Sequence, residues 1–490
     1  MVSDPPASMA PGMASRASIG AVLLASFFLP FAVTGPAIVL PGMAADLNAS
    51  SAGTQWVQNS YNAIFAATVL ATGSLADRFG RRLVLRTGIA TFGLAMALIA
   101  VSSNILVIDV LRGVQGLAAG ATVSAGSAVL AHSTSGPRRV RVFGLLGASF
   151  GGGTAAGPLV AGALAPLGWR SIFVVIALGA AIAFIASRYT QASSDPSAPR
   201  PDLPGMACFG GALLVLSLGF IRAGEAGWSN LWTLLAFAVT ILLLGVFVLV
   251  ELRSSHPMFD VRLFRRPSFT ALMCLPFSVT FGLAALNVFL PVFLQSGGAS
   301  PWRAAVELTP LEVPVLLVPL AARWLTSRWS MRTLLVAGPV LIAAGSFWLV
   351  VVDRGTSAWV SAPPLLLFGV GVGMAFSVMD NAAVSTVPVD KSGSAAGMFN
   401  TMRITGESLA VAATAAVLIS VTAARTSTTQ AVAAVQGRHV PVTTGQAFAD
   451  ALHVVVIGLG VLALVGAILT AWALRSSHDT EADEVRAGTR

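Results

Sequence analysis

Long apolar stretches without charged residues recur from one end of this sequence to the other. Many reach about 20 residues, the length that an α-helix needs to cross roughly 30 Å of hydrocarbon. Only 10% of the 490 residues are charged, against about 25% in ordinary soluble proteins. We therefore predict an all-α polytopic membrane protein. The first stretch, near Ser18, is too long for the apolar part of a cleaved signal peptide and is expected to stay in the mature protein.

Charged and turn-forming residues divide the apolar sequence into fourteen predicted spans. These begin near Ser18, Thr54, Leu83, Asn104, Val142, Ser171, Leu203, Trp228, Phe269, Ala304, Leu334, Ser357, Gly393 and Phe448. Polar segments follow the sixth span (Arg188 to Pro204) and the eighth (Arg253 to Pro267). The predicted domains are an N-terminal six-helix bundle (1–187), a linker with two extra helices (188–266), a C-terminal six-helix bundle (267–475) and a cytoplasmic tail (476–490).

The basic residues predict how the chain is oriented in the membrane. If both termini are cytoplasmic, 21 of the 29 lysines and arginines fall in cytoplasmic segments, six lie outside and two lie within spans. This distribution follows the positive-inside rule and predicts a multi-pass protein of the cytoplasmic (inner) membrane with both termini cytoplasmic. It also explains the net charge of +9 without nucleic-acid binding, because the arginines separate apolar spans instead of forming a basic domain. Lys391 is the only lysine, and the chain is rich in alanine and glycine, which indicates a GC-rich bacterial source.

A polar motif follows the second predicted span and is echoed in the second half of the chain. Its defining residues are Gly73, Asp77, Arg78, Gly80, Arg81 and Arg82. A glycine permits a tight turn, Asp77 is expected to cap a helix N-terminus, and the arginines are expected to pair across a domain interface. The segment from Leu325 to Arg332 echoes this motif weakly. Such paired halves are typical of transporters whose substrate site lies between repeats near mid-membrane.

Two further motifs lie inside predicted spans. Arg112 in the fourth span is a charge where charges are costly and usually functional, and Asp109 lies three residues earlier, a spacing that allows an ion pair. A purely structural pair is the alternative. The fifth span carries small residues and a proline at Gly144, Gly153, Gly157, Pro158 and Gly162. These allow close helix approach and a bend, although ordinary helix packing also explains them.

With these motifs, the sequence resembles the major facilitator superfamily over nearly its whole length, specifically the fourteen-helix drug:proton antiporter family of EmrB/QacA-like multidrug efflux transporters. The resemblance implies a major facilitator fold of 14 transmembrane helices, arranged 6+2+6 in two pseudo-symmetric bundles. It further implies a loop from Gly73 to Arg82 that latches the cytoplasmic side, a proton-transfer role for Arg112, and antiport from the fifth-span motif. One departure is Ala32, which occupies a position that is usually acidic in this family.

The carboxyl groups that remain within spans are therefore the candidates for proton coupling or for recognition of a charged substrate. A carboxyl group in a low-dielectric cavity can exchange protons near neutral pH. Glu407, one turn after Arg403, is the first candidate, followed by Asp380 and then by Glu312 and Glu307. A salt bridge or a hydrated boundary position is the alternative for each. Candidates for lining an apolar cavity are Trp56, Tyr61, Asn287, Gln295 and Asn381.

The predicted function is export of an apolar or cationic drug-like or antibiotic molecule in exchange for protons, by alternating access, by a monomer in the lipid bilayer. No GxxxxGK[ST] loop appears in the sequence, so the proton gradient is the predicted energy source, without a cofactor. No HExxH motif or cysteine pattern indicates an enzyme or a metal site. The alternatives are a proton-coupled metabolite exporter, an uptake symporter and a non-transporting membrane sensor.

Overall fold

The computed structural model describes residues 11–134, 136–191, 193, 202–254, 257, 259–385 and 392–488. Among these residues the regular structure is entirely helical, which confirms the all-α prediction. Short 3₁₀ helices occur at Ala165–Leu167, Ser187–Tyr189, Val261–Arg265 and Leu349–Val351.

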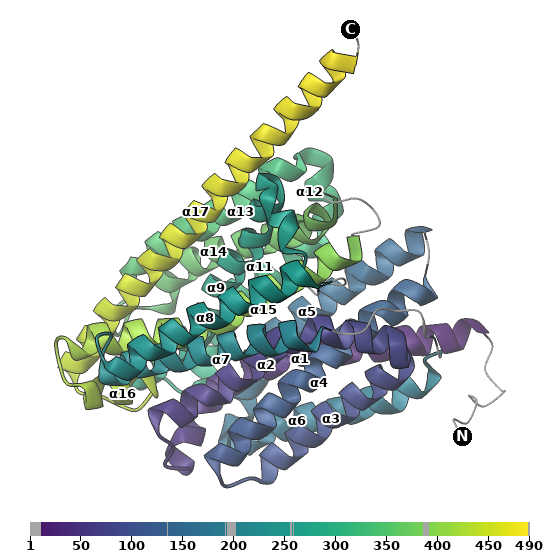
Figure 1. Ribbon diagram of the computed structural model, residues 1–490. Coiled ribbons are helices and arrows are strands. Elements are labelled where there is room, and N and C mark those ends of the chain that lie inside the picture. The colour runs from purple at the N-terminus through teal and green to yellow at the C-terminus, as the bar shows by residue number, and fades with distance from the viewer. Residues whose placement is uncertain are drawn as a thin grey trace.

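The long helices form two bundles with an additional helix pair (Figure 1). The first bundle contains α1 (Pro11–Asp46), α2 (Ser51–Phe79), α3 (Arg81–Val101), α4 (Ile105–Ser133), α5 (Gly136–Leu164) and α6 (Arg170–Ala186). The additional pair is α7 (Leu203–Ala226) and α8 (Leu231–Arg253). The second bundle contains α9 (Pro267–Ser296), α10 (Pro301–Glu307), α11 (Thr309–Leu320), α12 (Ala322–Arg328), α13 (Met331–Trp348), α14 (Ala358–Ser385), α15 (Ser392–Ala423), α16 (Thr428–Val435) and α17 (Val442–Gly488).

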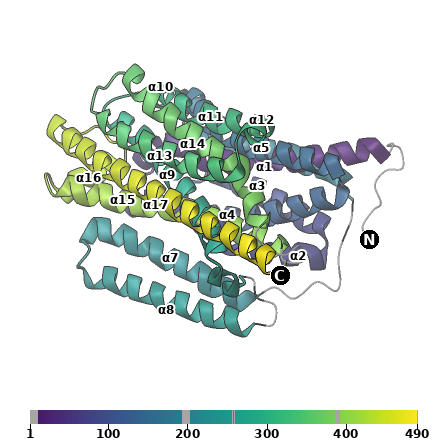
Figure 2. The same ribbon diagram turned by 90° about the horizontal axis from the view of Figure 1, so that it is seen from above.

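Helices α7 and α8 lie side by side at one edge of the molecule (Figure 2). Helix α7 packs against α2 of the first bundle and α15 of the second, whereas α8 packs mainly against α7. In the most apolar stretch of α8, which has a mean hydropathy of 2.9, only 22% of the residues are buried. In the most apolar stretch of α9, 83% of the residues are buried. Helix α8 is therefore suited to face lipid, and α9 lies in the centre of the bundle.

The described residues contain eleven helices that are long and apolar enough to cross a membrane. The predicted span near Ala304 is wrong as a single helix, because the chain there divides into α10, α11 and α12. Pro310, Pro314 and Pro319 lie within α11, and each removes a backbone N–H donor from this region. The total of fourteen crossings stays a prediction.

The fifth-span glycines lie at close contacts between helices. A Cβ atom on Gly153 would lie 2.0 Å from the Phe27 carbonyl oxygen of α1, and one on Gly157 would lie 2.2 Å from Thr34 Oγ1. Both distances are far below van der Waals contact, so α1 and α5 require glycine at these positions. The side-chain surroundings of Gly144 lie outside the described residues. A Cβ atom on Gly162 would contact α10 of the second bundle.

We predict that Gly153→Ala destabilises the fold by about 1–3 kcal/mol, because the added methyl group must push α1 away from α5. Gly147→Ala is the matched control, since a Cβ at this position of α5 meets nothing within 4 Å. Thermal unfolding of the two purified variants in detergent tests the prediction. Equal melting temperatures would show that α1 and α5 do not need this close approach.

Candidate functional site

A cavity of about 700 Å³ lies between the two bundles, within the size range of small-molecule sites. Helices α1, α2, α4 and α5 line one side, and α9, α11, α14 and α15 line the other. Its aromatic lining consists of Tyr61, Phe65, Phe143, Phe150, Phe376 and Phe399. Its polar lining consists of Thr34, Asn62, Ser127, Thr154, Asn287 and Asn400, and its charged residues are Arg403 and Glu407.

One face of α15 supplies both charged residues of the cavity. Residues 400, 403, 404, 407 and 411 all line it, and this spacing places them on a single helical face. Gly406 fixes the rotation of α15, because a Cβ at this position would lie 2.7 Å from the Phe277 carbonyl oxygen of α9. The close approach to α9 thus directs Arg403 and Glu407 towards the first bundle.

The Arg403 guanidinium lies between aromatic rings of the two bundles. Its central carbon is 5.7 Å from the ring centroid of Phe150 on α5 and 5.6 Å from that of Phe376 on α14. Both distances are suitable for cation–π attraction. Within the described residues no carboxylate lies within 4 Å of this guanidinium, and its Nε atom is buried without a hydrogen-bond partner. Arg403 therefore keeps donor capacity for a molecule in the cavity.

Arg112 is fully buried behind Tyr61, outside the cavity lining. Its guanidinium donates to the carbonyl oxygens of Val57 (2.6 Å) and Ala32 (3.0 Å). It also donates to the amide oxygens of Gln115 (2.7 Å) and Gln58 (3.0 Å). The guanidinium carbon is 4.6 Å from the centroid of the Tyr61 ring, which faces the cavity. Arg112 thus joins α1, α2 and α4 and supports the cavity wall.

The predicted ion pair between Asp109 and Arg112 is wrong for the described residues. Arg112 turns towards α1 and α2, where neutral oxygens occupy its donors, and Asp109 makes no hydrogen bond with it. Ala32 offers Arg112 only its backbone oxygen. This buried arginine is held by dipoles and an aromatic ring instead of a counter-ion.

The polar motif between α2 and α3 has the predicted turn but different contacts. Gly80 adopts a positive φ of 106°, which favours glycine. Asp77 does not cap α3, because it lies in the last turn of α2 and pairs with Arg81 at 2.8 Å. Arg82 donates to the Arg188 carbonyl oxygen at the end of α6 (3.0 Å), within the same bundle. The prediction of pairing across the domain interface is therefore wrong for these two arginines. Gly73 and the exposed Arg78 also lie on α2.

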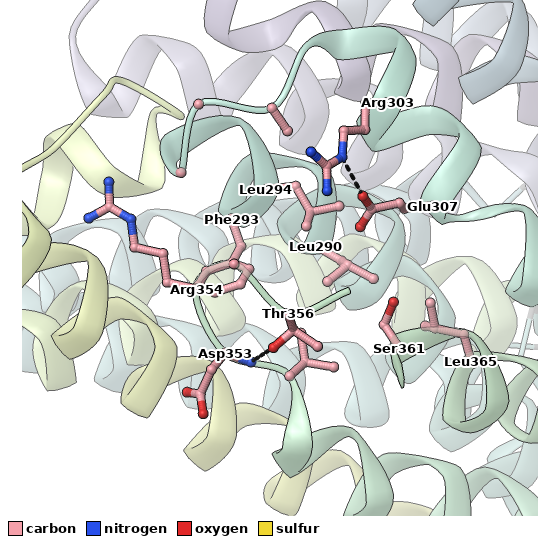
Figure 3. A pocket seen from close by; sticks show the side chains of 15 residues that line it. Leu290, Phe293, Leu294, Arg303, Glu307, Asp353, Arg354, Thr356, Ser361 and Leu365 are labelled. Carbon is pink, nitrogen blue, oxygen red and sulfur yellow. Dashed lines mark hydrogen bonds and ion pairs between the residues drawn. The ribbon is translucent and has the colours of Figure 1, made fainter. Parts of the chain in front are cut away.

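The other predicted carboxyl groups lie outside the cavity lining or outside the described side chains. Glu312 on α11 is 2% exposed and lies beside the side chain of Asn287, but within the described residues neither of its carboxyl oxygens has a hydrogen-bond partner. Glu307 pairs with Arg303 at 2.8 Å in a separate pocket of about 150 Å³ (Figure 3). The side chains of Asp380 and Asn381 lie outside the described residues.

Two of the predicted cavity residues, Tyr61 and Asn287, line the cavity, and two others do not. Trp56 is half-buried elsewhere on α2, and Gln295 donates to the Ile38 carbonyl oxygen at 3.1 Å. The sequence analysis missed Asn62, which is 1% exposed and whose amide atoms have no hydrogen-bond partner. The sequence did offer a signal for Asn62, because four amide side chains occur close together in this apolar span, and all four are buried: Gln55, Gln58, Asn59 and Asn62.

Two hydrogen bonds join the bundles at the end of the molecule where α1 ends. Gln295 of α9 binds α1 there, and Gln436 Nε2 donates to the Ala49 carbonyl oxygen at 3.4 Å. The cavity lining instead reaches Ser127 and Phe143, near the end of α4 and the start of α5. The cavity therefore extends towards the opposite end, where the α2–α3 turn lies. Among the described residues no group of three or more His, Cys, Asp or Glu is placed to hold a metal ion.

Two helical bundles around a central cavity are typical of multi-pass membrane transporters. A family model described as Major Facilitator Superfamily matches residues 22–411. The chain belongs to this superfamily. A solved structure of similar fold is a POT family transporter in complex with a thioalcohol conjugated peptide, with a TM-score of 0.63 and 14% identity over 92% of this chain and 94% of that one.

Relatives with similar sequences carry names that refer to drug resistance. Multidrug resistance protein Stp of Mycobacterium tuberculosis (strain CDC 1551 / Oshkosh) is 30% identical over 388 residues, which is 78% of this chain and 72% of that protein. The tetracenomycin C resistance and export protein of Streptomyces glaucescens is 29% identical, over 77% of this chain and 71% of that protein. The methylenomycin A resistance protein of Streptomyces coelicolor is 29% identical, over 74% and 78%.

Proposed function

We propose that this protein exports a drug-like or antibiotic molecule across the cytoplasmic membrane in exchange for protons, with fourteen crossings and both termini in the cytoplasm. The observation that carries the proposal is Glu407 in an aromatic cavity between two bundles, one turn from Arg403. Aromatic rings supply contact area for an apolar molecule, and the carboxyl group supplies an exchangeable proton. The names of the relatives support the substrate class and the direction.

Proton exchange at Glu407 changes the net charge of the cavity wall. With Glu407 ionised, its charge balances that of Arg403, and the cavity accepts an apolar molecule at little electrostatic cost. With Glu407 protonated, Arg403 remains as an unbalanced positive charge, which disfavours an apolar or cationic occupant. Binding of substrate and proton therefore oppose one another, as antiport requires.

Inverted membrane vesicles that contain the protein test this function. An imposed acidic interior is expected to drive uptake of a fluorescent drug, with about tenfold accumulation per pH unit for a one-to-one exchange when the membrane potential is clamped at zero. Collapse of the pH gradient is expected to release the drug, and vesicles without the protein are the control. Uptake that requires an alkaline interior would support a symporter and overturn the proposal.

A further inference from the structure

The short helix α12 and Trp329, the residue that follows it, carry an exposed group of two tryptophans and two arginines. Trp324 is 54% exposed and Trp329 is 45% exposed, and their ring centroids are 5.6 Å apart in an edge-to-face arrangement. The guanidinium carbon of Arg328 is 5.9 Å from the Trp324 ring centroid, and Arg323, the residue before Trp324 in the chain, is exposed. Leu325, 6% exposed, is the residue that anchors this helix to the bundle.

An apolar stripe on α11 leads into this group. Val313, Leu317 and Leu320 are 41%, 52% and 60% exposed, and their spacing continues through Trp324 to Arg328. Residues spaced by three or four share one side of a helix, so Val313, Leu317 and Leu320 form an aliphatic surface on α11. Along the chain this surface is followed, after the break at Ala321, by the aromatic Trp324 and the cationic Arg328 of α12. This order matches a bilayer, in which the acyl chains give way to the interface and then to the headgroups.

The arginines of this group lack the acidic partner that the first half of the chain provides. In the motif of the first half, Asp77 pairs with Arg81, whereas the equivalent position of the echoed motif is Ser327. The sequence contains no Asp or Glu between Glu312 and Asp353. Within the described residues neither Arg323 nor Arg328 forms an ion pair. Their positive charge is therefore available to an external anion.

The geometry points to a binding site for one anionic phospholipid on this surface. Its phosphate is held by Arg323 and Arg328, its glycerol region lies against Trp324 and Trp329, and one acyl chain follows the α11 stripe. Anionic lipid attracts surface arginines by about 1 kcal/mol each, which corresponds to roughly fivefold in affinity per residue. The site is separate from the cavity and does not depend on the proposed function.

Binding of dioctanoyl phosphatidylglycerol to the purified full chain in detergent at low salt, measured by native mass spectrometry, tests the site. We expect Arg323→Gln/Arg328→Gln to weaken binding by an order of magnitude or more, and phosphatidylcholine binding to stay unchanged. Arg222→Gln/Arg438→Gln, which removes two exposed arginines elsewhere, is the matched control. Ser327→Asp keeps both arginines but supplies an internal anion, and we expect it to weaken binding as well.

Three results would overturn the site. One is equal affinity of the wild type for phosphatidylglycerol and phosphatidylcholine. Another is unchanged phosphatidylglycerol binding by Arg323→Gln/Arg328→Gln. A third is displacement of the lipid by millimolar glycerol phosphate, which would reduce the site to simple anion binding without a role for the acyl chain. Unchanged melting temperatures of the variants in detergent alone are expected, since the substituted side chains are exposed.

Discussion

Glu407→Gln is expected to lower proton-driven drug accumulation in inverted vesicles from about tenfold per pH unit to the level of vesicles without the protein. The glutamine keeps the size and hydrogen-bonding capacity of the side chain but cannot release a proton. Because Arg403 then has no ionisable partner on the cavity face of α15, the positive charge in the cavity no longer changes during the cycle. Transport loses its link to the pH gradient.

Exchange of labelled for unlabelled drug separates this effect from misfolding. Exchange needs the cavity to bind substrate and reorient, but it does not need a proton to bind and leave in each cycle. Because glutamine resembles the protonated state, we expect Glu407→Gln to bind the drug more weakly but to retain exchange at saturating drug concentrations. Glu307→Gln is the matched control, since Glu307 pairs with Arg303 in a separate pocket and is expected to leave accumulation unchanged.

Other outcomes of this experiment would reassign the coupling residue. Full pH-driven accumulation by Glu407→Gln would contradict its role. Loss of accumulation by Glu312→Gln alone would assign the proton to α11, where the Glu312 carboxyl lies beside Asn287. Both carboxyl groups are close to the cavity, but only Glu407 lines it.

The sequence was sufficient for the helical architecture, because the physics that specifies a membrane span is local. A run of apolar residues without charges predicts a helix wherever it occurs, and all the described regular structure is helical. The single helix predicted near Ala304 is wrong for an equally local reason, because its three prolines have no backbone N–H and interrupt the helical hydrogen bonding.

The site was only partly predictable, because the residues that line a cavity depend on which side of each helix faces it. Arg403 and Glu407 were found from their rarity as charges in a span, and Tyr61 from its place on α2. Trp56 is on the same helix but turned away from the cavity. It lies five residues before Tyr61, and because a helix turns by about 100° per residue, the two side chains point to different sides. The partners of Arg112 lie 54 to 80 residues away on α1 and α2, except for Gln115, so no local pattern could show that neutral groups hold it.

Arg112→Leu is expected to be the most destabilising single substitution considered for this protein. The change would remove four hydrogen bonds and leave the oxygens of Ala32, Gln58 and Gln115 to find other partners, while the Val57 oxygen keeps its place within α2. A buried acceptor left unpaired costs about 1–3 kcal/mol. The sum is comparable to the whole free energy of unfolding of a typical domain, about 5–15 kcal/mol. We expect little folded protein in the membrane.

Arg112→Lys distinguishes a structural role from a role in proton transfer. Lysine keeps the positive charge but replaces the planar five-donor fork by a single ammonium group, which cannot reach all four oxygens from one point. If Arg112 supports the cavity wall through these contacts, the lysine variant will fold with a lower melting temperature and will lose drug binding and drug exchange together. Arg222→Leu, at an exposed position, should match the wild type. A lysine variant with wild-type stability and exchange but no response to the pH gradient would instead place Arg112 on the proton pathway. The hydrogen bonds of Arg112 and its contact with Tyr61 would then serve proton transfer and not only the support of the cavity wall.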